Sequence, residues 1–311
     1  MKRRLLFAPD IVILVYQAVV AALIVATWTR HDRPAAYLLI NLGLMAGTVV
    51  LALLDSRHPS KLTTFLHAWW PVIVVPISFK QIAWIGPGVH PFEDGAWDRK
   101  LQNLDEFLFG DTRRFFRAIA WGPAADLLTI GYWSYFFLPI VLGASLYRPA
   151  DLRKFREATT VMLVGWFVSY FGYFAVPALG PHRVLDGPRA AGLEGWLWAG
   201  PMHRALTAVE GRIPDAFPSG HALVAMLVVV LAWKLHRRLF WWLLPFATGL
   251  FLATLYLRYH YVVDVLVSVL LLPPCVGLGR ALQKLREPEI VESPGQVWEN
   301  RALSPTQEER P

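Results

Sequence analysis

The sequence predicts an all-α protein, a polytopic transmembrane helical bundle of about eight spans, from three observations. Of the 311 residues, 55% are hydrophobic and only 17% are charged, whereas soluble domains carry roughly 25% charged residues. The apolar residues form blocks of about 17 to 25, the length that crosses a hydrocarbon core about 30 Å thick. Short loops with Lys and Arg separate these blocks. The chain is therefore expected to be a multi-pass integral membrane protein.

The order of the spans follows from these blocks. They are expected at residues 11–29, 35–54, 65–85, 124–146, 159–176, 219–235, 240–257 and 261–280. The first block follows Met1-Lys2-Arg3-Arg4 but is too long for a signal peptide, which indicates an uncleaved first helix. Cys275, the single cysteine, lies inside an apolar block and supports neither a disulfide framework nor a cysteine metal site.

Loop charge predicts the orientation. Basic residues precede the first span and follow the second, fourth, sixth and eighth spans. An even number of spans places all these segments on one side, which the positive-inside rule makes cytoplasmic. Both termini are then expected in the cytoplasm, and the long loops near 86–123 and 177–218 are expected to face outward. The expected location is the plasma membrane, with the active site on its outer face. The net charge of +7 is thus explained by topology and anionic headgroups rather than by nucleic acid.

Four regions are expected: N-terminal transmembrane helices at 1–86, an outer loop at 87–123, a catalytic transmembrane core at 124–286 and a disordered cytoplasmic tail at 287–311. In the outer loop, Trp97, Leu101, Leu104 and Leu108 recur at helical spacing with charges on the other side. This pattern predicts an amphipathic helix that lies in the membrane interface or packs on the outer mouth of the bundle. Lys80, inside the third block, either snorkels outward or projects into the bundle.

Three ionisable residues are expected to meet at the outer ends of neighbouring helices. His221 begins the sixth span, His260 ends the seventh, and Asp264 begins the eighth. His260 and Asp264 are four residues apart and therefore share a helical face. The carboxylate can accept a proton from one imidazole nitrogen and leave the other free to attack, while His221 donates a proton to a leaving oxygen. The alternative is that both histidines are interfacial and that Asp264 only caps its helix.

An anion site is predicted beside these residues. Pro218-Ser219-Gly220 turns directly into the sixth span, so backbone N–H groups and the positive end of the helix dipole point toward that position. Two histidines, a carboxylate, nearby arginines and a helix N-terminus suit phosphoryl transfer, in which positioning and charge neutralisation dominate.

These residues carry a family resemblance. Pro218-Ser219-Gly220-His221, with His260 and Asp264 about forty residues later, resembles the second and third signature motifs of the type-2 phosphatidic acid phosphatase superfamily. The resemblance covers about 159–280, within the helical core, and it implies a six-helix phosphatase-type core in the bundle. The extra N-terminal spans, the stretch 104–110 and the stretch 258–265 resemble the inositol phosphorylceramide synthase (inositolphosphotransferase) branch.

The resemblance implies a role for each matching residue. His260 would be the nucleophile that forms a phosphohistidine, and Asp264 would orient it. His221 would be the general acid, and Ser219 with the Gly220 amide would hold phosphate oxygens. The resemblance implies neither a metal nor another cofactor.

The sequence departs from the phosphatase pattern at its arginines. The third motif of the phosphatases has an arginine six residues before the histidine, where this chain has Thr254, and the first motif is not recognisable. Arg183 is the first candidate phosphate ligand and Arg258 the second. Weaker candidates in the same loop are Arg189, Arg204 and Arg212.

The predicted function is a metal-independent lipid phosphatase or phosphotransferase that acts on a lipid phosphate or a phosphoinositol lipid at the outer membrane face. Its expected partners are this lipid substrate and membrane lipids, and no nucleic acid. The alternative is a non-enzymatic transporter of a lipid or small solute. Transporters commonly show internal repeats and ionisable groups at the midplane, and the sequence shows neither feature clearly.

Overall fold

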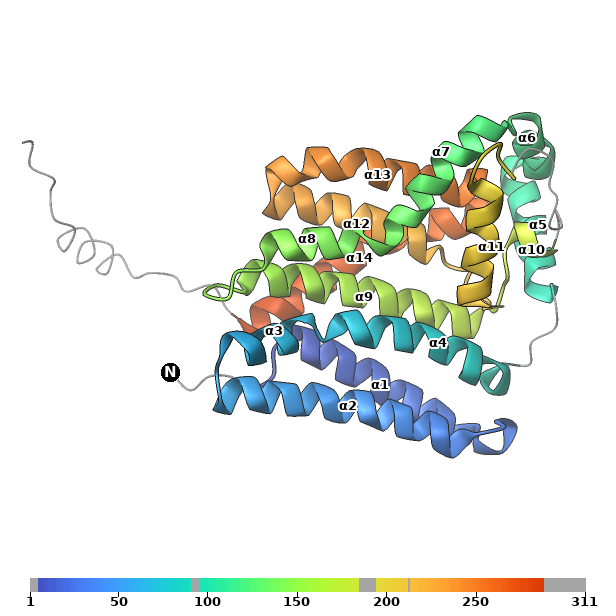
Figure 1. Ribbon diagram of the computed structural model, residues 1–311. Coiled ribbons are helices and arrows are strands. Elements are labelled where there is room, and N and C mark those ends of the chain that lie inside the picture. Colours follow the sequence, from blue (N-terminus) through green and yellow to red (C-terminus); the bar gives the residue numbers. More distant parts are fainter. Residues whose placement is uncertain (1–4, 91–94, 185–193, 212, 288–311) are drawn as a thin grey trace, which may run out of the picture.

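The protein folds as one bundle of roughly parallel and antiparallel helices (Figure 1). The computed structural model describes residues 5–90, 95–184, 194–211 and 213–287. In this part of the chain every regular element is a helix, so the predicted all-α bundle is confirmed. Most of the predicted disordered tail, residues 288–311, lies outside the described residues.

The helices that run along the bundle are separated by connections of very different length, some of which hold further elements. In chain order they are α1 (Ala8–Ala26), α2 (Pro34–Arg57), α4 (Pro71–Val89), α7 (Gly122–Trp133), α8 (Leu138–Leu146), α9 (Arg153–Ala175), α12 (Gly220–Leu235), α13 (Arg237–Tyr256) and α14 (Val262–Arg286). Shorter elements lie between them: η1 (Trp28–Arg30), α3 (Lys61–Trp69), α5 (Ala96–Phe109), α6 (Thr112–Ala118), η2 (Ser134–Phe136), α10 (Pro181–Val184) and α11 (Ala199–Glu210).

The predicted spans correspond to these helices. Six helical segments of the described chain are long and apolar enough to cross a membrane, with α3 and α4 forming one of them. A seventh span is broken: α7 with η2 and α8 meet at an angle of 45°. The remaining predicted span, the sixth in chain order, is α12, whose 16 residues extend about 24 Å, less than a hydrocarbon core of about 30 Å.

Helix α9 lies at the centre of the bundle and contacts α1, α4, α8, α12 and α14. On one side of it, α1 to α4 form a layer; on the other, α12, α13 and the bent α7–α8 pair pack together (Figure 1). Helices α7 and α13 approach closely at Gly131 and Gly249, where a Cβ on Gly131 would lie 2.7 Å from the Gly249 carbonyl carbon. Small residues at such crossings let backbones pack tightly within membranes.

The two ends of the bundle differ. At one end lie α5, α6, α10 and α11, here called the cap (Figure 1). At the other end lie α3, the connections after α2, α8 and α12, and the C-terminal end of α14, and these segments carry the basic residues counted above (Figure 1). The structure therefore brings the basic loops to one end, as expected from the span count. Which side of the membrane each end faces stays a prediction.

The layer of α1 to α4 is joined by buried polar side chains. His67 lies between Asp10 (3.0 Å from Nε2) and Asp55 (3.3 Å from Nδ1) at the end opposite the cap. Near the middle, Asn41 donates to Gln17, and Gln17 donates to Ser78. Such hydrogen bonds fix neighbouring helices where water is scarce.

Helix α5 occupies the predicted amphipathic segment. It buries Asp98, Leu101 and Asp105 against the bundle, and it exposes Leu104 and Phe107, the latter by 83%. Packing on the bundle and contact with the membrane are therefore compatible on this helix. The prediction placed its charges away from the bundle; the two aspartates are instead fully buried. Lys80 is half-buried within α4.

Candidate active site

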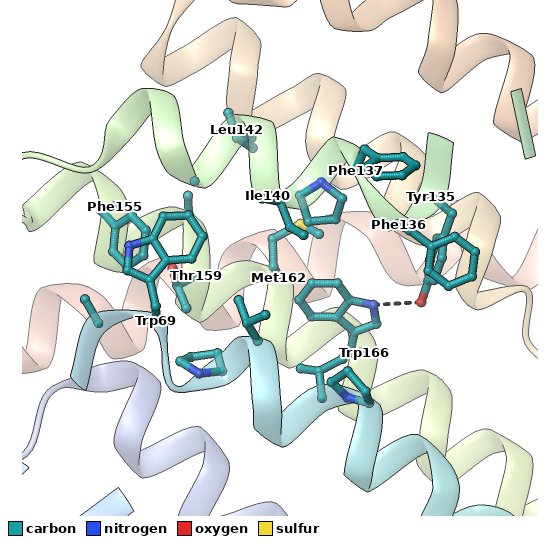
Figure 2. Close-up of a pocket in the computed structure, with 18 residues that line it drawn as sticks. Trp69, Tyr135, Phe136, Phe137, Ile140, Leu142, Phe155, Thr159, Met162 and Trp166 are labelled. Atoms are coloured by element: carbon teal, nitrogen blue, oxygen red, sulfur yellow. Dashed lines mark hydrogen bonds between the residues drawn. The ribbon is translucent and has the colours of Figure 1, made fainter. Parts of the chain in front are cut away.

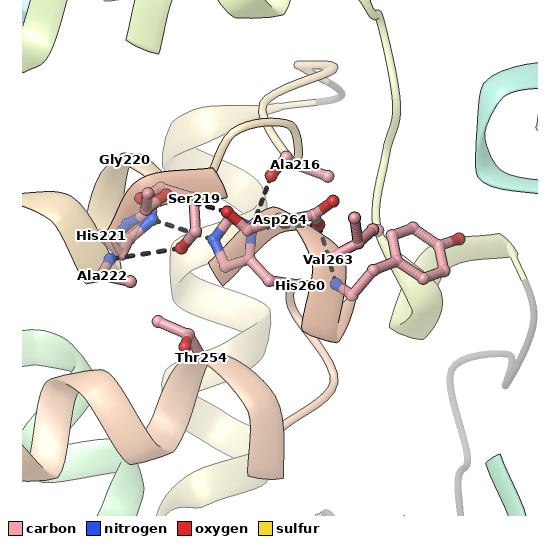
Figure 3. A network of polar contacts seen from close by, with 12 residues as sticks. Ala216, Ser219, Gly220, His221, Ala222, Thr254, His260, Val263 and Asp264 are labelled. Atoms are coloured by element: carbon pink, nitrogen blue, oxygen red, sulfur yellow. Dashed lines mark hydrogen bonds and ion pairs between the residues drawn. The ribbon is translucent and has the colours of Figure 1, made fainter. Parts of the chain in front are cut away.

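Three segments meet at the capped end of the bundle (Figure 3). Ser219 caps the N-terminus of α12 by accepting a hydrogen bond from the Ala222 amide at 3.2 Å, which places His221 in the first helical turn. His260 lies in the turn between α13 and α14. Asp264 lies in the first turn of α14, where its carboxylate accepts from the Tyr261 amide at 2.8 Å. The predicted convergence of His221, His260 and Asp264 is thus seen in the structure.

The His260 ring is held by a backbone carbonyl. Its Nδ1 lies 2.7 Å from the Ala216 oxygen, and because a carbonyl only accepts, Nδ1 must carry the proton. The lone pair is then on Nε2, which lies 3.4 Å from Nδ1 of His221. Both rings are at least nine-tenths buried. His260 therefore presents a basic nitrogen toward a second imidazole inside a shielded site.

Asp264 differs from the sequence expectation. Its closest oxygen lies 3.7 Å from His260 Nδ1, which is too long for a hydrogen bond. That proton goes to Ala216 instead, and the nearer Asp264 oxygen caps α14. Asp264 is fully buried, and its other oxygen, Oδ1, has no hydrogen-bond partner among the described residues. Its contact with the backbone at the start of α14 therefore replaces the predicted hydrogen bond to His260.

Ser219 and Gly220, the predicted phosphate ligands, line the same site but are bound within the protein. The Ser219 amide donates to the Asp264 carbonyl at 3.2 Å. The Gly220 amide donates to the Tyr173 hydroxyl at 3.1 Å, from the neighbouring α9. A Cβ on Gly220 would lie 2.3 Å from that hydroxyl, so only glycine fits here. An anion that binds the Gly220 amide would have to displace the Tyr173 hydroxyl.

Two tyrosines enclose the second histidine. The His221 ring stacks on Tyr132 with centroids 4.7 Å apart. On another side it meets Tyr135 at 4.3 Å. Both tyrosines come from the segment where the α7–α8 span is broken. The break therefore supplies the aromatic wall that fixes His221.

The candidate arginines lie farther out. Arg183, in α10, donates to the Gly211 carbonyl at 2.9 Å and contacts the neighbouring His182 ring. The Arg258 guanidinium carbon lies 5.2 Å from the Phe116 ring centroid in the cap, and the Arg258 carbonyl accepts from the His182 amide at 2.9 Å. Thr254, at the position of the phosphatase arginine, is buried and donates to the Phe251 carbonyl of its own helix.

Arg258 is thus directed toward the cap, and Arg183 lies beside His182 in α10. Of the weaker candidates, Arg204 is exposed on α11, and Arg189 and Arg212 lie outside the described residues.

Helix α5 holds the backbone around His260 in place. Asp105 accepts hydrogen bonds from the Val262 and Val263 amides, each at 2.8 Å. These are the first amides of α14, which have no partner within the helix. Asp98, seven residues earlier, accepts from the Leu179 and Gly180 amides and from the Tyr261 hydroxyl. Burial raises the pKa of both carboxyls, and the hydrogen bonds act in the opposite direction.

A further aspartate anchors the outer helix α11. Asp126 on α7 accepts from four consecutive amides, those of residues 196–199, at 2.8 to 3.0 Å. This carboxylate therefore caps the start of α11. In turn, α11 carries His203, whose Nδ1 lies 2.7 Å from the Tyr259 hydroxyl. Tyr259 stacks on Tyr132 with centroids 4.2 Å apart, so α11 is connected to the aromatic wall beside His221.

The electrostatic environment keeps His260 neutral. Burial lowers its pKa from 6.5 to about 4, although the charge of Asp215 and the Ala216 carbonyl act in the opposite direction. Asp215 itself has a raised pKa because it is shielded from water, opposed by the charges of Arg183 and His260. At neutral pH the His260 ring is therefore an uncharged base, as a nucleophile requires.

The arrangement combines a neutral imidazole, a second imidazole within reach of it and a helix N-terminus. Among the described residues, no group of three or more His, Cys, Asp or Glu side chains is placed to hold a metal ion. Such a site can transfer a group by attack of a histidine nitrogen and proton donation from the other ring.

Several residues of the site were not anticipated from the sequence. Asp98 and Asp105 could have been suspected, because two aspartates seven apart share one face of a helix. Tyr132 and Tyr135 carry no such signal, since aromatic residues are frequent throughout this chain. Asp215 precedes the Ser219 turn by four residues, and its charge was the only available indication.

Comparisons with known proteins indicate the family of the chain. The sequence model described as "PAP2 superfamily" matches residues 99–275, more than half of the chain. The chain is also similar to a phosphoinositol dihydroceramide synthase of Bacteroides thetaiotaomicron, with 24% identity over 202 residues that cover 58% of this chain and 64% of that protein. The chain thus spans less than two thirds of the length of this relative. No solved structure matches the chain.

Proposed function

The chain belongs to the PAP2 superfamily, and from that premise we propose that it is a membrane enzyme that transfers a phosphoryl or phosphoinositol group through a phosphohistidine. The family and the synthase-like relative support an enzyme that acts on lipid phosphates. The observation that carries the proposal is the tautomer of His260. Its Nδ1 proton is bound by Ala216, and Nε2 faces His221.

The first half of the proposed reaction forms a bond between phosphorus and His260 Nε2. As this bond forms, the bond from phosphorus to the leaving oxygen breaks, and the leaving oxygen takes a proton from His221. His260 Nε2 and His221 Nδ1 now lie 3.4 Å apart, so the substrate phosphate must separate these two nitrogens when it enters. Apo geometry of this kind is compatible with catalysis, because contacts in a site tighten or rearrange on binding.

In the second half, an acceptor hydroxyl attacks the phosphohistidine. Its proton passes to His221, the bond from phosphorus to nitrogen breaks, and neutral His260 is restored. Water as acceptor makes the enzyme a phosphatase; a lipid or polyol hydroxyl makes it a phosphotransferase. The extra helices α1 to α4 and the synthase among the relatives favour transfer.

Arg183 and Ser219 are proposed as phosphate ligands, and Arg258 is proposed to act through the cap. The charge of Arg183 acts on Asp215, next to the Ala216 carbonyl that binds His260, and the N-terminus of α12 adds a positive dipole end. We further propose that this end of the bundle faces outward from a plasma membrane, because the basic loops gather at the other end. A transporter is the less favoured alternative, since the ionisable site lies at one end of the bundle.

The test is an assay of the purified protein in detergent with EDTA. The lipid panel contains phosphatidic acid, a polyprenyl pyrophosphate, and phosphatidylinositol with and without ceramide or diacylglycerol. Free phosphate establishes a phosphatase, and a new phosphodiester lipid without free phosphate establishes a transferase. A His260→Ala variant is the matched control. Equal signals from the variant and the wild type on every lipid would refute the assignment.

A trapping experiment tests the intermediate itself. Acid quench after mixing with labelled lipid phosphate is expected to leave no label, and alkaline quench is expected to retain it, because phosphohistidine is acid-labile. The label should map to the peptide that contains His260. Label on another residue would exclude the proposed nucleophile.

A further inference from the structure

A large apolar groove lies beside the candidate active site (Figure 2). It has a volume of about 360 Å³ and runs between α3–α4, the η2–α8 segment and α9. Ligand sites typically have volumes of roughly 300 to 1,000 Å³. Trp69 and Phe155 line one end of the groove, and Tyr135 and Trp166 line the other. The groove is therefore large enough for a ligand and apolar along its length.

Prolines shape the walls. Pro76 lies inside α4, and Pro139 lies in the first turn of α8; both line the groove. Proline bends a helix because it lacks an N–H and its ring pushes against the preceding turn. The α7–α8 span also changes direction by 45° at the groove. The path of the backbone in α4 and in the α7–α8 span therefore contributes to the shape of the groove.

The groove is separated from the site by one aromatic ring. Tyr135 lines the groove, and its ring lies 4.3 Å from the His221 ring. The Trp166 indole donates a hydrogen bond to the Tyr135 hydroxyl at 2.9 Å (Figure 2). The Tyr135 ring therefore forms a wall of both the groove and the candidate active site. A molecule bound at His221 would lie next to this end of the groove.

The rim of the groove is exposed on the lateral surface of the bundle. Val72, Phe137 and Ile140 are between 43% and 61% exposed. In a membrane-spanning chain this surface meets acyl chains rather than water. A lipid can therefore reach the groove from the side, without leaving the bilayer.

We propose that this groove binds one hydrocarbon chain of the substrate lipid, with the chain passing Tyr135 and ending against Trp69 and Phe155. This rests on the proposed function, because it takes the substrate to be a lipid whose phosphate reaches His260. The Trp69 and Phe155 rings pack against each other with centroids 5.3 Å apart. This pair closes the far end and sets the longest chain that fits.

Gly143 offers a way to fill the far end. A Cβ on this residue would lie 3.4 Å from Trp69 and 3.5 Å from Phe155, an ordinary contact. A Gly143→Leu side chain therefore occupies the end of the groove, and leucine favours the helix more than glycine does. Gly277→Leu, on α14, is the matched control, because a Cβ there meets nothing within 4 Å.

The first readout is photolabelling, which needs no turnover. Phosphatidic acid with a diazirine at the end of a long acyl chain is expected to label peptides around Trp69 and Phe155. Gly143→Leu should reduce this labelling about tenfold, and Gly277→Leu should leave it unchanged. Equal labelling by a phosphatidylcholine probe would identify an ordinary membrane lipid, and loss of labelling on dimerisation would identify a partner helix; either result overturns the proposal.

The second readout is chain-length dependence of turnover. Gly143→Leu should raise KM for long-chain substrates by about tenfold and leave dioctanoyl substrates unchanged, whereas Trp69→Leu should extend the accepted length. Equal effects on all lengths, with unchanged labelling, would refute the groove while the enzymatic function stands. Selective labelling without turnover of any phosphate lipid would refute the function while the groove stands.

Discussion

Two buried clusters of histidine and aspartate lie at opposite ends of the bundle, and they differ in how the imidazole nitrogens are bound. His67 has a carboxylate oxygen on each side, from Asp10 and Asp55. His260 has a carbonyl at Nδ1 and another imidazole at Nε2. Carboxylates on both sides favour a proton on both nitrogens, which leaves no lone pair. The same residue types thus join helices at one end and form the proposed nucleophilic site at the other.

The largest expected difference between the clusters is in catalysis. His260→Gln should lower turnover on the order of 10⁴-fold or more, because it removes the nucleophile. His67→Gln should leave the turnover of the folded protein nearly unchanged, since this side chain lies at the far end of the bundle. Turnover per folded molecule is the measurement. Comparable losses in both variants would show that the comparison is wrong.

The next largest effect is on stability, and there the order reverses. His67→Ala leaves two buried carboxylates without their shared imidazole, which should cost about 3 to 5 kcal/mol of unfolding free energy. Denaturant unfolding in mixed micelles measures this cost.

A triple variant serves as the control for that result. Asp10→Asn and Asp55→Asn added to His67→Ala remove the unpaired charges, so much of the lost stability should return. Without such recovery, the contribution of His67 to stability is not electrostatic.

Removal of a contact between the cap and the active site should have an effect smaller than those above. Asp105→Asn replaces one of the acceptor oxygens for the Val262 and Val263 amides with a donor, at a cost of about 1 to 3 kcal/mol. Because these amides adjoin His260, we expect kcat to fall about tenfold with little change in KM. The exposed neighbour Glu106 provides the control, since Glu106→Gln makes the same change of charge. A change in KM alone would argue against a positioning role.

The smallest expected effect is on pH dependence. With the pKa of His260 near 4, the acid limb of kcat/KM should lie well below 6.5. The Asp215 carboxylate raises that pKa, so Asp215→Asn should move the acid limb to lower pH, by roughly one unit or less. A shift to higher pH would contradict the assigned arrangement. Asp151→Asn, an exposed residue at the far end, controls for net charge.

The lowered pKa of His260 also makes the free energy of unfolding depend on pH. The unfolded chain binds a proton at His260 near pH 6.5, and the folded chain does so only near pH 4. Over that interval the folded state holds fewer protons, so the contribution of His260 lowers stability as the pH falls.

The sequence predicted the bundle and the meeting of His221, His260 and Asp264 because both depend on local patterns. Apolar block length determines the spans, and alternation of the spans brings their ends together. The hydrogen bond that holds His260 was not predictable, because its acceptor is the carbonyl of Ala216, 44 residues away. A backbone carbonyl has no sequence signature. Asp264 was therefore assigned a contact that the main chain makes instead.

The cap illustrates the same limit. The sequence showed that α5 is amphipathic, and it suggested that the charges point away from the bundle. The buried partners of Asp98 and Asp105 are amides more than 70 residues away, and every non-proline residue carries such a donor. A local pattern predicts that a helix has an apolar and a polar face. Which of these faces packs on the bundle, and which groups it contacts there, depends on the assembled fold.

The short length of α12 couples the site to the bilayer. The C-terminus of α12 lies at the basic connection, and His221 lies at its other end. Because the helix has only 16 residues, His221 lies closer to the basic end than it would on a helix that spans the full hydrocarbon core of about 30 Å. The segment from Ile213 to Ser219, which is mostly buried, continues from the start of α12, and non-helical backbone can lie within a membrane only when protein surrounds it. A thicker bilayer would recess the histidines further from the headgroups, whereas a thinner one would bring them level. Membrane thickness should therefore act on this protein as a regulator of activity.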